Sequence, residues 1–266
     1  MQISILGCGW LGLPLAESLV SKGFSVKGST TSPEKMGHLK LCKITPFLVS
    51  LSQDEINGDI IGFLDHSEVL IIDIPPRLRS SITENFIQKI RNIIPFIEVS
   101  SVKKILFVSS TSVYGDENAW VTENTIPNPD TESGRQLWEV EKMLQNNSNF
   151  TTTILRFGGL IGTDRHPVKQ LAGKENVANG SAPVNLIHQE DCIGIIVTVL
   201  EQNVWGEIFN AVAPFHPSRA AYYIQKANQL GLLPPQFSKE NSSTGKVIAS
   251  EKTEKKLKYS FKLELY

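Results

Sequence analysis

Cysteine is scarce in this chain of 266 residues, where Cys8, Cys42 and Cys192 are its only thiols. Three widely spaced cysteines without a Cys-x-x-Cys pair argue against a disulfide framework and against a zinc site. We therefore expect a reduced, cytoplasmic protein with no metal centre.

The chain also lacks an excess of charge of either sign. Its 26 Lys and Arg residues balance 27 Asp and Glu residues, for a formal net charge of −1. Without a global basic field, we expect neither nucleic acid nor an anionic membrane surface as a partner. Apolar runs of the roughly 20 residues that span a membrane are missing, as is a secretory signal pattern. The expected partner is a small molecule, and a homodimer remains open.

The first dozen residues hold the strongest local pattern. A short apolar run at 3–6 meets Gly7, Gly9 and Gly12 in G-x-G-x-x-G spacing, and apolar residues then recur at helical intervals over 11–20. This strand, turn and helix predict a dinucleotide site, with backbone N–H groups and the helix N-terminus facing a pyrophosphate. The alternative is an ordinary glycine turn.

The second predicted strand, at 24–29, bears on the choice of cofactor. An NAD-binding chain usually places an acidic residue at its end to hold the adenosine ribose. Residues 27–35 instead supply hydroxyls and lysines, including Ser29, Thr30, Thr31 and Lys35. This favours NADP over NAD, unless these side chains merely face water.

Strands and helices alternate from residue 2 to 157. Further strands are predicted at 46–49, 69–74, 104–108 and 152–157, with amphipathic helices at 82–97 and 137–144. The pattern predicts an α/β fold, a doubly wound parallel sheet of the Rossmann type. We expect a dinucleotide-binding domain at 1–158, with 184–213 completing its sheet. Residues 159–183 and 214–266 then form a small C-terminal lobe on the substrate side.

Two prolines stop the strand at 69–74. Ligands bind at the carboxyl ends of parallel strands, so Asp73, Arg77 and Arg79 are candidates for the edge of the cleft. The arginines could equally face water, with Pro75 only ending the strand. Farther on, Pro95 is expected to kink or end the helix at 82–97.

Five segments match one known family: G-C-G-W-L-G at 7–12, V-S-S-T-S-V-Y-G at 108–115, L-R-F-G-G-L-I-G at 155–162, N-L-I-H-Q-E-D at 185–191 and I-F-N at 208–210. With them the chain resembles the extended short-chain dehydrogenase/reductases, the NAD-dependent epimerase/dehydratase-like group. The resemblance implies an NAD(P)-dependent oxidoreductase or epimerase-like enzyme acting on a small polar or sugar-derived substrate. Ser110 matches the family's catalytic hydroxyl, and Tyr114 matches a family residue that is usually structural.

The chain departs from that family in two places. Its glycine spacing is GxGxxG where the family usually has GxxGxxG, and its acid/base pair differs. Alignment places Ser133 at the family's tyrosine and Leu137 at its lysine. A serine hydroxyl has too high a pKa to replace a lysine-tuned phenol as proton donor. The chain therefore resembles an atypical member that lacks Tyr-x-x-x-Lys. The same spacing at Tyr222 and Lys226 falls in the C-terminal part, where an ordinary helix face is expected.

Replacement chemistry has few candidates. Arg135 could hold an anionic group, although a surface helix arginine is the commoner outcome. His188 and the segment 165–167 could reach the cleft. The alternative is that their histidines are ordinary core or loop residues. The predicted catalytic set is Ser110, Tyr114, Arg135 and His188. The predicted cofactor set is Gly7, Gly9, Trp10, Leu11, Gly12, Ser29, Thr30, Thr31, Lys35, Pro75 and Ser109.

The missing acid/base pair also supports a second function. Some members of the family without the tyrosine and lysine sense NADP(H) and act through partner association rather than turnover. A non-catalytic NADP(H)-sensing module therefore stays open beside the enzyme.

Overall fold

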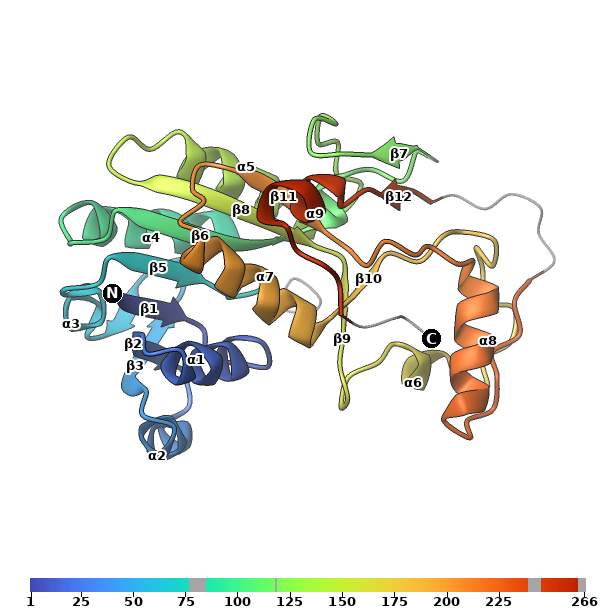
Figure 1. Cartoon of the computed structure of the whole chain (residues 1–266), viewed down its shortest axis with the longest axis horizontal. Coiled ribbons are helices and arrows are strands. Elements are labelled where there is room, and N and C mark those ends of the chain that lie inside the picture. Colours follow the sequence, from blue (N-terminus) through green and yellow to red (C-terminus); the bar gives the residue numbers. More distant parts are fainter. Residues whose placement is uncertain (77–84, 118, 239–244, 263–266) are drawn as a thin grey trace.

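An eight-stranded sheet forms the centre of the chain (Figure 1). The computed structural model describes residues 1–76, 85–117, 119–238 and 245–262. The strand order is β11-β8-β6-β5-β1-β2-β3-β4, and every pairing is parallel except that of β3 with β4. The strands are β1 (Gln2–Leu6), β2 (Ser25–Thr30), β3 (Thr45–Leu51), β4 (Ile56–Gly58), β5 (Val69–Ile72), β6 (Lys104–Ser110), β8 (Thr151–Phe157) and β11 (Ile208–Ala211).

After β1 the chain first adds strands on one side of β1 and then adds strands on the other side. β2 and β3 follow on one flank, whereas β5, β6, β8 and β11 build the opposite flank. This is the doubly wound Rossmann-like sheet that the alternating pattern predicts. A reversal of strand order opens a crevice at the carboxyl ends, here between β1 and β5.

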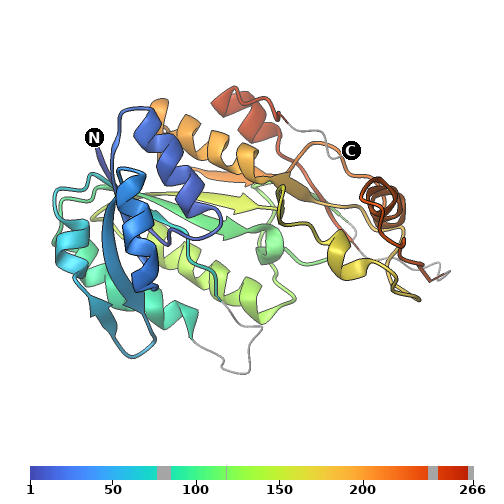
Figure 2. The ribbon, with the colours of Figure 1, turned by 90° about the horizontal axis from the view of Figure 1, so that it is seen from below.

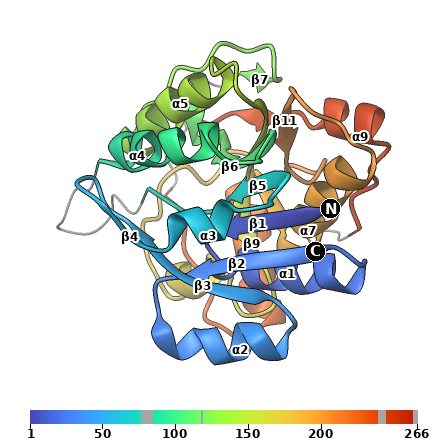
Figure 3. The same cartoon turned by 90° about the vertical axis from the view of Figure 1, so that its left-hand side faces the viewer.

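Alternating side chains of the strands divide the core into two clusters. Ile3 and Ile5 pack on one face of β1, while Leu6 packs on the other. The first face carries α1 (Gly12–Ser21), α2 (Met36–Leu41), α7 (Gln189–Glu201) and α9 (Glu251–Leu257). The second carries α3 (Ile60–Leu64), α4 (Phe86–Glu98) and α5 (Glu132–Gln145), as the end-on view shows (Figure 3). Helices therefore cover both faces of the sheet.

A smaller lobe lies beyond the carboxyl ends of the strands (Figure 2). It contains α6 (Val168–Leu171), α8 (Arg219–Gln229) and a parallel pair of β9 (Gly159–Ile161) with β10 (Leu186–His188). A second pair joins β7 (Trp120–Val121) to β12 (Val247–Ile248). Within the segment 184–213, β11 joins the main sheet, but β10 pairs with β9 outside it. A third apolar cluster holds α6 and α8 together.

Pro95 does not end its helix, because α4 continues to Glu98. The expectation that the helix ends at the proline was wrong for a packing reason, while the kink stays a prediction. Ile93 and Ile97 flank the proline, and both are fully buried against the sheet. Burial of this apolar face outweighs one lost backbone hydrogen bond. The described part of α4 begins at Phe86, where Asn85 accepts a hydrogen bond from the backbone N–H of Gln88.

Candidate cofactor site

Gly7 and Gly12 bring backbone against backbone in the turn after β1. Gly7 has a φ of +107°, and a side chain there would collide with the carbonyl of Asp73. A side chain on Gly12 would collide with the carbonyl of Gly7. By contrast, a Cβ on Gly9 would have no atom within 4 Å. The turn is therefore closed at two glycines and open at the third, where a phosphate can approach the backbone.

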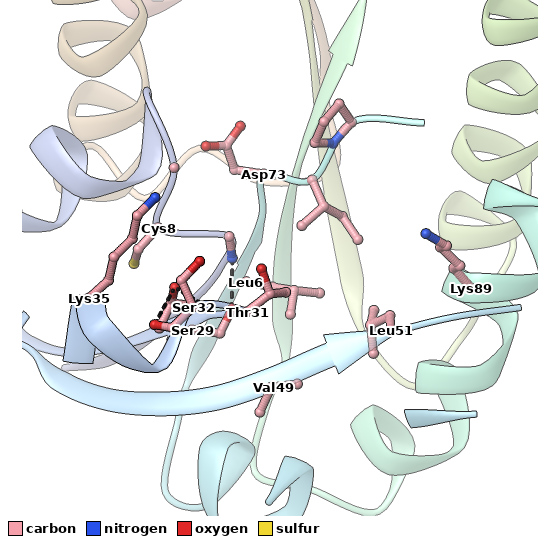
Figure 4. A pocket seen from close by; sticks show the side chains of 15 residues that line it. Leu6, Cys8, Ser29, Thr31, Ser32, Lys35, Val49, Leu51, Asp73 and Lys89 are labelled. Atoms are coloured by element: carbon pink, nitrogen blue, oxygen red, sulfur yellow. Dashed lines mark hydrogen bonds between the residues drawn. The ribbon is translucent and has the colours of Figure 1, made fainter. Parts of the chain in front are cut away.

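A cleft lies beside this turn, at the carboxyl ends of β1, β2 and β5 (Figure 4). It coincides with the reversal of strand order, the usual ligand position in open α/β sheets. Its lining residues are Leu6, Gly7, Cys8, Gly9, Ser29, Thr30, Thr31, Ser32, Lys35, Val49, Leu51, Asp73, Ile74, Pro75 and Lys89.

Most residues predicted for the cofactor line this cleft: Gly7, Gly9, Ser29, Thr30, Thr31, Lys35 and Pro75. Leu11 and Gly12 are buried where α1 begins. Sequence reasoning missed the contribution of β3, through Val49 and Leu51, and of α4, through Lys89. No local pattern marks these residues, because only the folded sheet brings their elements to the cleft. Arg77 and Arg79 lie outside the described residues.

Ser29 fixes the glycine turn to the end of β2. The backbone N–H of Gly7 donates to its Oγ at 2.8 Å, and the N–H of Cys8 donates to its carbonyl at 2.8 Å. Ser29 itself is buried. The two hydrogen bonds hold the start of the phosphate loop in one conformation.

Asp73 follows β5 and faces the same turn. Its carboxylate accepts a hydrogen bond from the backbone N–H of Gly12 at the start of α1, yet burial raises its pKa to about 8. Desolvation disfavours the charged form more than one hydrogen bond favours it. At neutral pH this carboxyl therefore stays mainly protonated, and little negative charge opposes an anionic ligand.

The segment after β2 lines the cleft with hydroxyls and a lysine. Thr31, Ser32 and Lys35 follow β2, and the Lys35 side chain points along the cleft wall (Figure 4). The Oγ1 of Thr30 accepts from the backbone N–H of Ser32 at 3.1 Å. Among the described lining residues, Asp73 is the one carboxylate, and it belongs to the glycine turn. This part of the lining thus carries cationic and neutral donors.

Trp10 connects the glycine turn to the lobe rather than lining the cleft. Its indole N–H donates to Asp164 Oδ1 at 2.9 Å, and the Arg165 guanidinium lies 4.9 Å from its ring centre. Gln189 Nε2 donates to the Trp10 carbonyl at 2.5 Å. Arg165, a candidate for reaching the cleft, therefore packs on the tryptophan instead.

Ser109 and Ser110 end β6 with different surroundings. The buried Ser109 hydroxyl donates to Glu141 Oε1 at 2.5 Å. Ser110 is half-buried, and its Oγ accepts from the backbone N–H of Ser112 at 3.1 Å. Because the Ser110 oxygen accepts in this bond, the Ser110 O–H can still donate a hydrogen bond to a ligand.

Tyr114 belongs to a buried polar network. Its hydroxyl accepts from Arg156 Nη1 at 2.6 Å and donates to Asn210 Oδ1 at 2.9 Å. Arg156 also binds Glu141 through Nε and Nη2. Burial raises the pKa of Tyr114, with Arg156 opposing the shift. The hydroxyl is thus engaged on both sides, which makes Tyr114 a positioning group for the core.

Arg135 and His188 have local partners. Arg135 Nε lies 3.0 Å from Glu132 Oε2 on the exposed face of α5. His188 precedes α7, and its Nδ1 accepts from the backbone N–H of Glu190 at 3.2 Å. Leu137, at the family's lysine position, is buried in the core, and Ser133 is half-buried. Any catalytic role for Arg135 or His188 stays a prediction.

The Tyr222 to Lys226 spacing lies on α8, in the lobe core. His166 Nδ1 accepts from the backbone N–H of Val168, so Nε2 carries the hydrogen that bonds Tyr222 Oη at 2.8 Å. Burial, with nearby lysines, lowers the pKa of His166 to about 4. Tyr222 is buried and does not line the cleft. His166 and Tyr222 thus pack the lobe.

Solved structures share this fold at low sequence identity. A functionally unknown conserved protein from Silicibacter pomeroyi matches with a TM-score of 0.79 and 20% identity, over 98% of this chain and 94% of that one. A short-chain dehydrogenase/reductase superfamily protein from Agrobacterium tumefaciens with bound NAD matches with a TM-score of 0.81 and 16% identity, over 100% and 94%. UDP-glucuronic acid 4-epimerase from Bacillus cereus, in complex with NAD, gives 0.80 and 19%, over 100% and 93%.

No helix in the described segments is both long and apolar enough to cross a membrane. No family model matches the chain. A closer relation comes from sequence, since Protein YeeZ of Escherichia coli K12 is 38% identical over 249 residues, which cover 93% of this chain and 90% of that protein. With that identity and coverage, the chain belongs to the YeeZ family.

Proposed function

We propose that this chain binds a nicotinamide dinucleotide, with NADP(H) preferred, and acts as an oxidoreductase or epimerase-like enzyme on a small polar or sugar-derived substrate. The observation that carries the proposal is the open approach to Gly9 within a cleft at the reversal of strand order. The N-terminal end of α1 suits a pyrophosphate, because the helix dipole places partial positive charge there. Solved structures with the same fold hold NAD, which supports binding of a nicotinamide dinucleotide.

The preference for NADP(H) rests on the charges at the end of β2. Thr31, Ser32 and Lys35 offer donors to a 2′-phosphate, and no described carboxylate lies beside them in the lining. Charge-assisted hydrogen bonds from lysine to phosphate are among the stronger polar contacts. A carboxylate at this point would repel the phosphate instead.

When bound, the dinucleotide supplies or takes up hydride. In this proposal Ser110 donates its hydroxyl hydrogen to the substrate oxygen and polarises the carbonyl carbon. Its Oγ is fixed for this by the backbone N–H of Ser112. Ser133 is too weak an acid to act as the proton donor, so the donor is a group other than the family's tyrosine.

Cofactor binding tests the proposal directly. Purified protein is titrated with NADPH, NADH, NADP and NAD by calorimetry, next to a Gly9→Asp variant whose carboxylate should exclude the pyrophosphate. Gly37→Asp is the matched control, because Gly37 is also open around its Cβ but lies outside the cleft lining. We expect NADPH to bind the parent and the control but not Gly9→Asp. Failure of all four dinucleotides to bind the parent would refute the proposal.

The NADP(H) preference has its own test at Thr31. A Thr31→Asp variant should weaken NADPH binding by about tenfold or more, since a charged hydrogen bond is replaced by repulsion. NADH binding should hold or improve, because the new carboxylate can accept from the ribose hydroxyls. Equal weakening of both cofactors would contradict the assigned orientation.

A non-catalytic NADP(H) sensor is the second candidate. The observation in its favour is Leu137, an apolar core residue at the position of the family's lysine. A sensor should change oligomeric state or capture a partner when NADPH binds, without turnover of any substrate. A panel of sugar-derived and small carbonyl substrates, followed by cofactor absorbance, separates it from the enzyme, and Ser110→Ala should lower only turnover.

A further inference from the structure

Three side chains with metal-binding atoms meet where α1 and α2 lie side by side (Figure 1 and Figure 3). Glu17 comes from α1, His38 from α2, and Cys42 is the residue that ends α2. In the described segments, this is the one group of three or more His, Cys, Asp or Glu residues whose ligand atoms all lie within 4.8 Å of one another. None of the three lines the cofactor cleft.

The distances fit a single small ion. Cys42 Sγ lies 3.0 Å from Glu17 Oε1 and 3.9 Å from His38 Nε2. Zinc bonds of about 2.0 to 2.3 Å in a tetrahedral arrangement separate neighbouring ligand atoms by roughly 3.3 to 3.7 Å. These two distances lie within a few tenths of an ångström of that range. The ligand atoms of Glu17 and His38 lie within 4.8 Å of each other, so side-chain rotation can bring all three atoms around one ion.

The two helices hold the three side chains close together. His38 and Cys42 are four residues apart, so their side chains project from one face of α2. Glu17 approaches that face from α1 through its hydrogen bond with the Cys42 thiol. Glu17 and His38 are exposed and Cys42 is half-buried, which leaves an entry path for an ion.

We propose that Glu17, His38 and Cys42 form a Zn²⁺ site with three protein ligands and a fourth position open to water. Thiolate, imidazole and carboxylate are the three ligand types that zinc uses in proteins. Binding replaces the S–H bond of Cys42 with an S–Zn bond and releases that proton to solvent, with no change of oxidation state. The ion would then cross-link α1 to α2.

Cysteine spacing alone gives no sign of this site. A search for Cys-x-x-Cys pairs misses ligands that come from two helices, with only His38 and Cys42 at the helical i, i+4 interval. The Glu17 hydrogen bond raises the pKa of the Cys42 thiol.

Zinc affinity of the full-length chain tests the proposal. Reduced protein is stripped with EDTA, desalted and titrated with Zn²⁺ against a chromophoric chelator. We expect one ion per chain. Cys42→Ser and His38→Gln should each weaken binding by more than about 100-fold, above the loss expected for an outer-shell partner, and Glu17→Gln by at least roughly tenfold. The control is His66→Asn, which removes an exposed histidine outside the cluster.

Cobalt gives an independent readout of the sulfur ligand. Co²⁺ bound to the parent should show a thiolate charge-transfer band in the near ultraviolet, which His66→Asn retains and Cys42→Ser loses. Zinc should also protect Cys42 from a thiol reagent, since Cys8 and Cys192 are buried. Unchanged zinc affinity in Cys42→Ser, equal loss in His66→Asn, or no binding by the folded parent would overturn the proposal. Circular dichroism and NADPH titration confirm that each variant is folded.

Discussion

Asp73 shows how one residue can set the charge of a binding cleft. It follows the buried strand β5, and its carboxyl meets the start of α1, where a pyrophosphate would be held. An ionised carboxylate there would repel the ligand. Burial raises its pKa to about 8, so the protonated form prevails at neutral pH.

Cofactor affinity should therefore depend on pH through Asp73. Between pH 7 and 9.5 we expect NADPH binding to weaken in the parent as Asp73 ionises, and to stay flatter in Asp73→Asn, whose amide carries no charge. Calorimetric Kd values across this range provide the measurement. Identical pH profiles for parent and variant would contradict the role given to Asp73.

The free energy of unfolding should also depend on pH through Asp73. The pKa of Asp73 in the folded chain, about 8, lies above its ordinary value of 3.8, so the folded state holds the proton more tightly. Its stabilising contribution is present below about pH 4 and is lost as the pH rises to about 8. Urea unfolding should show Asp73→Asn gaining stability relative to the parent over this interval, and the reverse trend would be inconsistent with a raised pKa.

At the scale of elements, one buried network ties four of them together. Ser109 of β6, Glu141 of α5, Arg156 of β8 and Asn210 of β11 are linked by hydrogen bonds, and all four are buried. Tyr114 joins them through its hydroxyl. Buried hydrogen-bond networks of this kind fix the relative positions of strands and helix.

Removing one charge from that network should be costly. Arg156→Met would leave the Glu141 carboxylate buried without its ion pair, for an expected loss of about 3 to 5 kcal/mol in free energy of unfolding. Denaturant titration measures this loss. Adding Glu141→Gln to the same chain should restore part of it, because no uncompensated charge then remains, and a double variant less stable than the single one would argue against the ion pair as the cause.

At the scale of the whole molecule, the lobe is attached near the glycine turn. Trp10 contacts Asp164 and Arg165, while Gln189 bonds the Trp10 carbonyl. Inside the lobe, His166 bonds Tyr222 and the backbone of Val168. Weaker packing of the lobe should thus change the position of the glycine turn in the cofactor cleft.

Acid should loosen the lobe before the Rossmann sheet. The pKa of His166 is lowered to about 4, below the 6.5 of a free histidine, so the neutral ring stabilises the fold above pH 6.5. That contribution is lost as the pH falls toward 4, when protonation of Nδ1 breaks the bond from Val168. Hydrogen exchange should increase in α6 and α8 over this interval. His166→Gln should remove most of this dependence, whereas the exposed-site variant His66→Asn should keep it.

Local sequence was sufficient for the elements with strong periodicity. The strands predicted at 104–108 and 152–157 lie within β6 and β8, and the helix predicted at 137–144 lies within α5. The antiparallel edge strand β4 and the short helices α2, α3 and α6 were not predicted. Each spans only three to six residues, too few for a helical or strand periodicity to stand out in the sequence.

Local patterns of residues are sufficient to predict the doubly wound sheet, because burial on both faces requires continuous apolar strands alternating with amphipathic helices. The sequence also determined the glycine turn, because backbone contact at Gly7 and Gly12 excludes any side chain. Only the tertiary structure decided which side chains meet. Strand order brought β3 and α4 to the cleft, enclosed Asp73 enough to keep its proton, placed Leu137 in the core and set Glu17 against Cys42. These outcomes depend on distances between residues far apart in the chain, which composition and spacing do not encode.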